Sequence, residues 1–314
     1  YTNMTHFQPG LVHTPVTPFK RDHSIDFDTY AKIIEFHLRN GAEALALPMP
    51  EGEDLSLTDA EQRKLLEFAL KQVKGRVPVI AHASDAGTSI AVARAVHAEQ
   101  AGATAIVSHP PYFWHPRPAM VVEHLVQIGS AVRLPFFIVN PPVESAGTTL
   151  STEIVLQVAE RLPNLAGVVD ASLDFVFMEE VIPNGRRLRP QFQLLAGGDF
   201  PVSAGALGGS GVFSPLSSVA PKLVRQLHDL CGKEKYVEAR KIQEDIGALH
   251  HAIKSAGESG LKDGLAGLKA ALRTMGRECG EPRPPVRSLG EVQYGKLAEA
   301  MAAMPFLRAE PRGW

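Results

Sequence analysis

The chain has 314 residues, of which 45% are hydrophobic and 21% are charged, as in a soluble globular protein with one large domain. The formal net charge of -2 gives no reason to expect nucleic acid as a partner, and no apolar run approaches the roughly 20 residues of a membrane-spanning helix. Residues 1–10 lack the pattern of a secretory signal, and two cysteines are too few for a disulfide framework. We therefore expect a cytoplasmic protein that binds neither membrane nor nucleic acid.

Short apolar segments alternate with amphipathic segments eight times along the chain. The predicted strands are 11–19, 44–48, 77–83, 105–110, 135–140, 165–171, 192–197 and 211–215. Apolar strands joined by single helices indicate a parallel sheet that helices cover. Eight such units in about 230 residues predict a closed (β/α)8 TIM barrel. An open dinucleotide-binding sheet is disfavoured, because KRDHSID follows the first strand instead of a G-x-G-x-x-G motif.

Several of the intervening helices have readable ends. Thr58 and Glu61 form the sequence pattern of a capping box, and Ser151 precedes another apolar-periodic stretch. Glycines mark the expected helix ends at Gly41, Gly75 and Gly102.

The strand pattern stops after residue 231. Segments 232–256, 261–275 and 290–303 are typical of helices, and a proline-rich bridge runs over 281–287. We therefore predict a barrel over residues 1–231 and a C-terminal helical extension over residues 232–314 that packs on it.

Titratable side chains occur where several predicted strands end, which is where TIM-barrel enzymes carry their chemistry. They are Glu51 after the second strand, His82 at the third, His109 at the fourth and Asp170 at the sixth. Such groups exchange protons near neutral pH or hold a divalent metal. Their spacing matches no recognised ligand motif, so we predict catalytic residues with no metal and no cofactor. A packing role for either histidine is the alternative.

A series of short motifs resembles the dihydrodipicolinate synthase / N-acetylneuraminate lyase family. The motifs are VTPF at 16–19, EGE at 51–53, PPYF at 110–113, VNPP at 139–142, GVVDAS at 167–172, LLAGGD at 194–199 and LGGSGV at 207–212. Their order and spacing extend the resemblance over the whole barrel and into the tail. It implies a lyase of small 2-oxo acids that assembles as a homodimer or homotetramer.

The same resemblance exposes several departures from the family pattern. Family members bind a 2-oxo acid as a Schiff base on a lysine of the sixth strand, and the matching residue here is Val169. The family's tyrosine proton relay corresponds to Val139, and its carboxylate-binding threonine pair corresponds to Pro50 and Glu51. The tyrosine that crosses the family's dimer corresponds to Phe113. Valine and phenylalanine cannot transfer protons, so the imine mechanism cannot run in its usual form.

We also looked for a lysine elsewhere that could replace the one on the sixth strand. None of Lys20, Lys222, Lys254 and Lys262 lies on a predicted strand, so none has the enclosed position that would lower its pKa for nucleophilic attack. We therefore expect no relocated Schiff base. The arginine that meets the family's second substrate falls near Glu144.

The resemblance also implies a set of residues around a small carboxylate ligand. These are Thr17, Asn140, Val139, Val169, Tyr112, Phe113, Gly197 and Gly198. Backbone N–H groups of the glycine pair suit an anion, and Asp199 suits the N-cap of the following helix. A subunit contact is the alternative role for Tyr112 and Phe113.

Two hypotheses of function follow. The first is a divergent lyase for a small 2-oxo or hydroxy acid that uses Glu51, His82, His109 or Asp170 in place of an imine. The second is a catalytically silent barrel that binds a small carboxylate or serves a structural or partner role. The apolar Val139 and Val169 favour the second, and the additional titratable groups favour the first.

Overall fold

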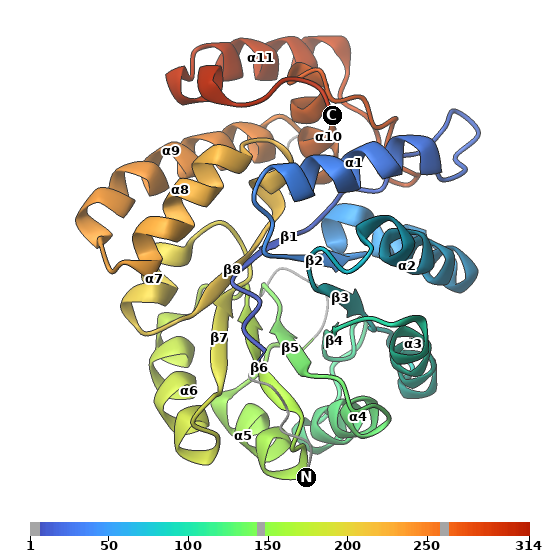
Figure 1. The fold of residues 1–314 in the computed structure, drawn as a ribbon, viewed down its shortest axis with the longest axis vertical. Coiled ribbons are helices and arrows are strands. Elements are labelled where there is room, and N and C mark those ends of the chain that lie inside the picture. The colour runs from blue at the N-terminus through green and yellow to red at the C-terminus, as the bar shows by residue number, and fades with distance from the viewer. Residues whose placement is uncertain (1–6, 143–147, 258–263) are drawn as a thin grey trace. The chain divides into compact units, whose positions relative to one another are not determined.

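The computed structural model describes residues 7–142, 148–257 and 264–314, and its strands form a closed barrel in the order β1 to β8 (Figure 1). The strands are β1 (Leu11–His13), β2 (Ala44–Leu47), β3 (Val79–His82), β4 (Ala105–Ser108), β5 (Phe136–Asn140), β6 (Leu165–Asp170), β7 (Gln193–Ala196) and β8 (Gly211–Ser214). Neighbouring strands from β2 to β8 pair in parallel. The predicted TIM barrel is confirmed.

Nearly every strand residue is buried, as expected when the barrel interior and a layer of helices cover the two faces of a parallel sheet. The first strand is shorter than predicted. It ends at His13 rather than at residue 19, because Pro15 and Pro18 carry no N–H for a ladder. Phe19 instead forms an isolated antiparallel bridge with Ile25.

Packing divides the chain into two compact units, and each is described by itself. The first unit comprises residues 1–12, 43–47 and 78–213, and the second comprises residues 13–42, 48–77 and 214–314. The first unit therefore contains all the barrel strands except the last residues of β1 and β8. The boundary at residue 231 stays a prediction.

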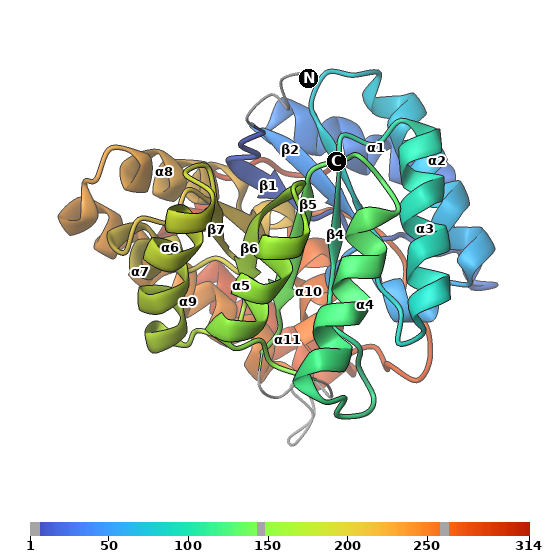
Figure 2. The ribbon, with the colours of Figure 1, turned by 90° about the horizontal axis from the view of Figure 1, so that it is seen from below.

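Helices of the first unit lie outside the strands and pack in chain order (Figure 2). They are α3 (Thr88–Ala101), α4 (Pro118–Ser130), α5 (Thr152–Arg161), α6 (Phe175–Leu188) and α7 (Pro201–Ala206). Ser151 caps α5 as predicted, since its side chain accepts a hydrogen bond from the N–H of Ile154. The predicted capping role of Asp199 is wrong, because α7 begins one residue later with Phe200 as its N-cap.

The second unit holds six α-helices within its described residues. They are α1 (Phe27–Arg39), α2 (Asp59–Val73), α8 (Pro221–Gly232), α9 (Tyr236–Ser255), α10 (Gly264–Thr274) and α11 (Glu291–Ala302). The predicted capping box is present at the start of α2, between Thr58 and Glu61. The predicted tail helices are confirmed as α9, α10 and α11, although residues 258–263 lie outside the described part of the chain.

None of the helices in the described part of the chain combines the length and apolar character that crossing a bilayer requires.

We expect Gly167→Ala to lower the free energy of unfolding by about 3 kcal/mol or more, because its Cβ would lie 2.1 Å from the carbonyl oxygen of Gln193 on β7. In Gly247→Ala, the new Cβ lies in α9 and meets nothing within 4 Å. This control should gain about 0.5–1 kcal/mol from helix propensity. Urea unfolding measures both, and equal stability of the two variants would contradict the tight β6–β7 approach.

Candidate active site

Register between neighbouring strands places a row of side chains on one face of the barrel sheet. His82 pairs with Val107, Val107 with Phe137, Phe137 with Gly167, and Gly167 with Gln193. Residues in register point to the same face, and so do residues two positions apart on one strand. His82 therefore shares its face with Val139 and Val169.

The opposite face of β5 and β6 is identified by Asn140. Its side-chain oxygen accepts a 2.8 Å hydrogen bond from the N–H of Leu150, just before the outer helix α5. Asn140 and its register partner Asp170 thus face the helix layer. Val139 and Val169, one residue earlier, face the barrel interior together with His82.

Two imidazoles and a hydroxyl form a compact cluster at the carboxyl ends of β3 and β4. Nε2 of His82 lies 2.9 Å from Nδ1 of His109, and the ring planes meet at 87°. The hydroxyl of Ser84 lies 2.7 Å from Nε2 of His82 and accepts a 2.7 Å hydrogen bond from the backbone N–H of His109. The structure therefore brings together two predicted catalytic residues and adds Ser84.

The short distance between the imidazole nitrogens limits the protonation states of the pair. One of the two nitrogens must donate a hydrogen and the other must accept it, so Nε2 of His82 and Nδ1 of His109 cannot both be protonated at this contact. Burial lowers the pKa of His109 to about 4. His109 is therefore neutral at physiological pH and presents a nitrogen that can accept a proton.

Arg94 of α3 holds the turn that carries Ser84. Its guanidinium donates a hydrogen bond to the carbonyl oxygen of Ser84 and forms a 3.3 Å ion pair with Asp85. Both side chains are largely buried, with exposed fractions of 13% and 21%, so solvent screens the pair only partly. This contact fixes the backbone from which the Ser84 hydroxyl reaches the two histidines.

The surroundings of Val169 are apolar. Val169 is 1% exposed and lies in register between Val139 and Leu195 on the two adjacent strands. This row provides hydrocarbon contact but no group that titrates or attacks.

Asp170 lies beside this row on the helix-facing side. Its Oδ1 accepts hydrogen bonds of 2.9 Å from Asn140 and 2.7 Å from Ser172. Its Oδ2 is buried and has no hydrogen-bond partner within the described residues, and burial raises the pKa of the carboxyl group. The arrangement suits a carboxyl group that organises the end of β6.

The glycine pair after β7 offers fewer free donors than expected. The N–H of Gly197 donates a 2.6 Å hydrogen bond to the carbonyl oxygen of Asp170, so it is already engaged. A Cβ at Gly197 would meet Ala171 at 2.8 Å, which explains the glycine by close packing. A Cβ built at Gly198 would meet nothing closer than the Phe200 ring at 3.9 Å, so the space on that side of Gly198 is open.

Of the aromatic residues predicted at the ligand, Phe113 is 89% exposed and adopts a left-handed φ of 78°. Tyr112 beside it is half-buried. The predicted position of Glu144 lies outside the described residues.

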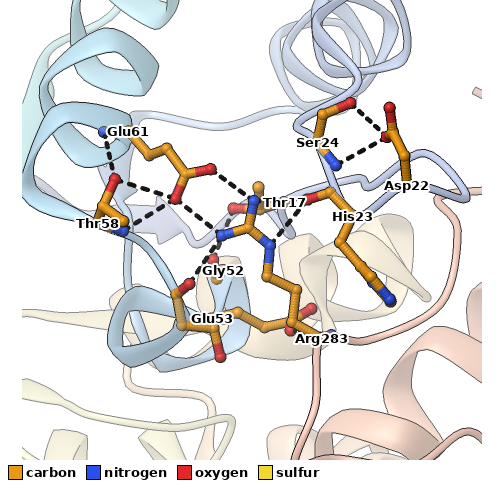
Figure 3. A network of polar contacts seen from close by, with 10 residues as sticks. Thr17, Asp22, His23, Ser24, Gly52, Glu53, Thr58, Glu61 and Arg283 are labelled. Atoms are coloured by element: carbon orange, nitrogen blue, oxygen red, sulfur yellow. Dashed lines mark hydrogen bonds and ion pairs between the residues drawn. The ribbon is translucent and has the colours of Figure 1, made fainter.

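In the second unit, Thr17 and Glu53 belong to one polar network (Figure 3). The Thr17 hydroxyl donates a 2.6 Å hydrogen bond to the carbonyl oxygen of Gly52. Nζ of Lys269 on α10 lies 2.6 Å from Oε1 of Glu53 and donates to the Thr17 carbonyl oxygen at 3.0 Å. The Lys269 and Glu53 side chains are 3% and 0% exposed, so this is a buried ion pair.

Arg283 ties the proline-rich bridge into the same network (Figure 3). Its backbone N–H donates to Oε2 of Glu53 at 2.8 Å, and its guanidinium forms two hydrogen bonds with the carboxylate of Glu61. This arginine lowers the pKa of Glu61 to about 2 through those hydrogen bonds. The network explains Glu53 as a residue that organises loops.

Glu51 has a different environment within the second unit. It lies on the 3-10 turn η1 (Pro50–Gly52), where burial raises the pKa of its carboxyl group and Thr14 contributes a hydrogen bond. A raised pKa keeps this carboxyl group protonated to a higher pH than usual, as a general acid requires.

No group of three or more His, Cys, Asp or Glu side chains suited to a metal ion occurs among the residues with described positions.

Known proteins resemble this chain in both sequence and fold. The model of the dihydrodipicolinate synthetase family matches residues 8–304. The 4-hydroxy-tetrahydrodipicolinate synthase of Bartonella tribocorum is 30% identical over 96% of this chain and 99% of its own length, and that of Nitrobacter hamburgensis is 35% identical over 83% and 85%. The crystal structure of dihydrodipicolinate synthase from Aquifex aeolicus superposes with a TM-score of 0.85 at 27% identity, covering 94% of this chain and 97% of that one.

A closed (β/α)8 barrel with polar groups at its strand ends and a helical tail defines the class of protein. Within that class, the chain belongs to the dihydrodipicolinate synthetase family.

Sequence reasoning missed Lys269, Arg94 and Asp85. Lys269 lies at helical spacing between Leu265 and Leu272, on the apolar side of a predicted helix. A charged residue at such a position indicates a buried ion pair. No comparable signal marks Arg94, because its contact with Ser84 depends on how α3 folds back beside β3.

We expect Lys269→Met to lower the free energy of unfolding by about 3–5 kcal/mol, because it leaves the Glu53 carboxylate buried without its cation. The double variant with Glu53→Met should recover part of this loss. Lys222→Met removes an exposed lysine that donates to the Ala309 carbonyl and serves as the control. Guanidinium unfolding measures the series, and a Lys269→Met protein as stable as the control would contradict the structural role of the pair.

The His109 imidazole should stay neutral down to about pH 4, since burial lowers its pKa. Its folded pKa lies below the unfolded value, so the unfolded chain binds more protons and stability falls as the pH drops from about 6.5 to 4. Histidine NMR titration, assigned with His109→Gln, checks the pKa, and urea unfolding at several pH values should give a shallower pH dependence in His109→Gln than in the exposed control His251→Gln. A His109 resonance that titrates near pH 6.5 would refute the assignment.

Proposed function

We propose that the chain is a lyase that acts on a small 2-oxo or hydroxy acid and transfers protons through His82, Ser84 and His109 without a lysine imine. The observation that carries the proposal is the 2.9 Å contact between the two imidazoles, on the sheet face that also bears Val169. Family membership supports the reaction class, since the curated relatives are synthases of 4-hydroxy-tetrahydrodipicolinate.

The strands themselves argue against an imine in this barrel. None of the eight contains a lysine, and the position that resembles the family's lysine is Val169. Lys269 does not replace it, because its ammonium group is buried against Glu53 and donates to backbone carbonyls. A lysine nitrogen that is engaged in these buried contacts is not free to attack a carbonyl.

Without an imine, the carbonyl oxygen of the substrate must itself accept the electron pair that leaves the C3–H or C3–C4 bond. A neutral imidazole takes the C3 proton, the electrons form the C2–C3 double bond, and a second donor protonates or hydrogen-bonds the developing oxyanion. The His82–Ser84–His109 cluster supplies both an accepting nitrogen and donors at one position. The resulting enol adds to an aldehyde, and the reverse sequence cleaves the same bond.

Other predicted residues take supporting roles in this proposal. Val139 and Val169 contact the hydrocarbon part of the acid, and the open backbone at Gly198 suits its carboxylate. Asp170 orders the end of β6 through Asn140.

The second candidate function is a silent barrel that binds a small carboxylate without turnover. The apolar row of Val139, Val169 and Leu195 favours it, because these residues occupy adjacent register positions at the centre of the expected reaction site. A dimer or tetramer of this chain remains our expectation, supported by the exposed Phe113 beside Trp114.

The test follows deuterium incorporation at C3 of pyruvate and longer 2-oxo acids in D2O by proton NMR. We expect protein-dependent exchange that falls by about 100-fold or more in His82→Gln and in His109→Gln, as for loss of an acid–base group. Exchange should persist in His251→Gln, which alters an exposed histidine of α9.

Borohydride added to the same incubations distinguishes the mechanisms. We expect no reduced adduct on any lysine by intact-mass analysis. A stoichiometric lysine adduct would overturn the imine-free mechanism, and specific binding without exchange of any acid would favour the silent barrel.

A further inference from the structure

We propose that a groove at the N-terminal ends of β5, β6 and β7 binds a small aromatic carboxylate, with Arg189 as its anion contact. This lower groove has a volume of about 320 Å3 and lies within the first unit. It is at the end of the strands opposite to the histidine cluster, so it is separate from the proposed active site.

The walls of the lower groove suit a flat apolar group. They include Phe7 and Phe192, the rings of Pro135, Pro163 and Pro190, and the side chain of Leu188. Leu188 is 44% exposed, so its side chain is accessible from the groove. The volume accommodates a single ring with a short side chain, since ordinary ligand pockets begin near 300 Å3.

Most polar groups of the groove already serve the fold. The amide nitrogen of Asn164 donates to the carbonyl oxygens of Gly129, Val132 and Leu134. The amide nitrogen of Gln193 donates to the carbonyl oxygen of Phe7. These contacts leave little capacity for a polar ligand at the amides.

Arg189 differs from these amides because most of its donors are unused. Its Nη2 donates a 2.7 Å hydrogen bond to the carbonyl oxygen of Ala159, which anchors the guanidinium beside the end of α5. The Nε atom is buried without a hydrogen-bond partner in the part of the chain that the structure describes. The guanidinium has five N–H donors, and because the Nε–H is buried, the N–H groups on Nη1 and Nη2 are the ones that can meet an anion in the groove.

Charge selects the ligand class. Among the described residues that line the groove, Arg189 is the one charged residue, and none is an aspartate or glutamate. A carboxylate neutralises this cation, and an aromatic ring covers the proline and phenylalanine walls. A surface arginine that is merely hydrated would show no preference for such a ligand.

The probe is phenylacetate, with phenylacetamide as its uncharged isostere, measured by ligand-observed NMR and calorimetry. We expect phenylacetate to bind and the amide to bind at least about tenfold more weakly, because a charge-assisted contact is lost. Arg189→Met should weaken phenylacetate by about tenfold or more, and Arg187→Met, which alters an exposed arginine two residues earlier, should not change it.

Arg189 also donates a hydrogen bond to the carbonyl oxygen of Ala159, so Arg189→Met could lose binding through a loss of fold. A second variant is therefore needed to test the groove. Leu188→Ser removes an exposed wall residue and should weaken phenylacetate several-fold at unchanged melting temperature. Absence of phenylacetate binding, equal binding of the amide, or binding that survives both variants would overturn the proposal. Binding should be unchanged in His109→Gln, so this outcome is independent of the active-site proposal.

Discussion

Alternation of side chains along the parallel strands is the constraint on which the rest of the structure depends. Each strand is hydrogen-bonded in a fixed register to its neighbours. A step of one position along a strand therefore moves a side chain from the barrel interior to the helix layer. His82 and Val169 thereby share the interior face, whereas Asp170 and Asn140 turn outward. The chemistry available to the barrel follows from this division.

The apolar side chain of Val169 limits what this part of the barrel interior can do. A buried lysine provides a covalent electron sink, and a valine provides only hydrophobic contact. The paired imidazoles differ from both, because they add a proton acceptor and a donor without a covalent bond to substrate. In the proposed function, the same barrel supports acid–base chemistry at one wall and hydrocarbon binding at another.

The second unit depends on charges that are paired inside the protein. Lys269 and Glu53 would each be costly to bury alone, and together they join α10 to the turns around Thr17 and Gly52. Arg283 extends this network to the start of α2 through Glu61. Glu53 therefore contributes to the order of the loops through its buried ion pair, although it lies only two residues after Glu51 in the sequence.

Local periodicity and short motifs were enough to predict the repeat of strand and helix, the capping box at Thr58 and the family. The sequence also brought His82 and His109 to the same end of the barrel, since both follow parallel strands. Only the tertiary structure decided that their rings touch, that Gly197 uses its N–H within the fold, and that Phe113 is exposed. The physical reason is that local pattern fixes which residues end a strand, whereas contacts between residues 25 or more apart depend on register and packing.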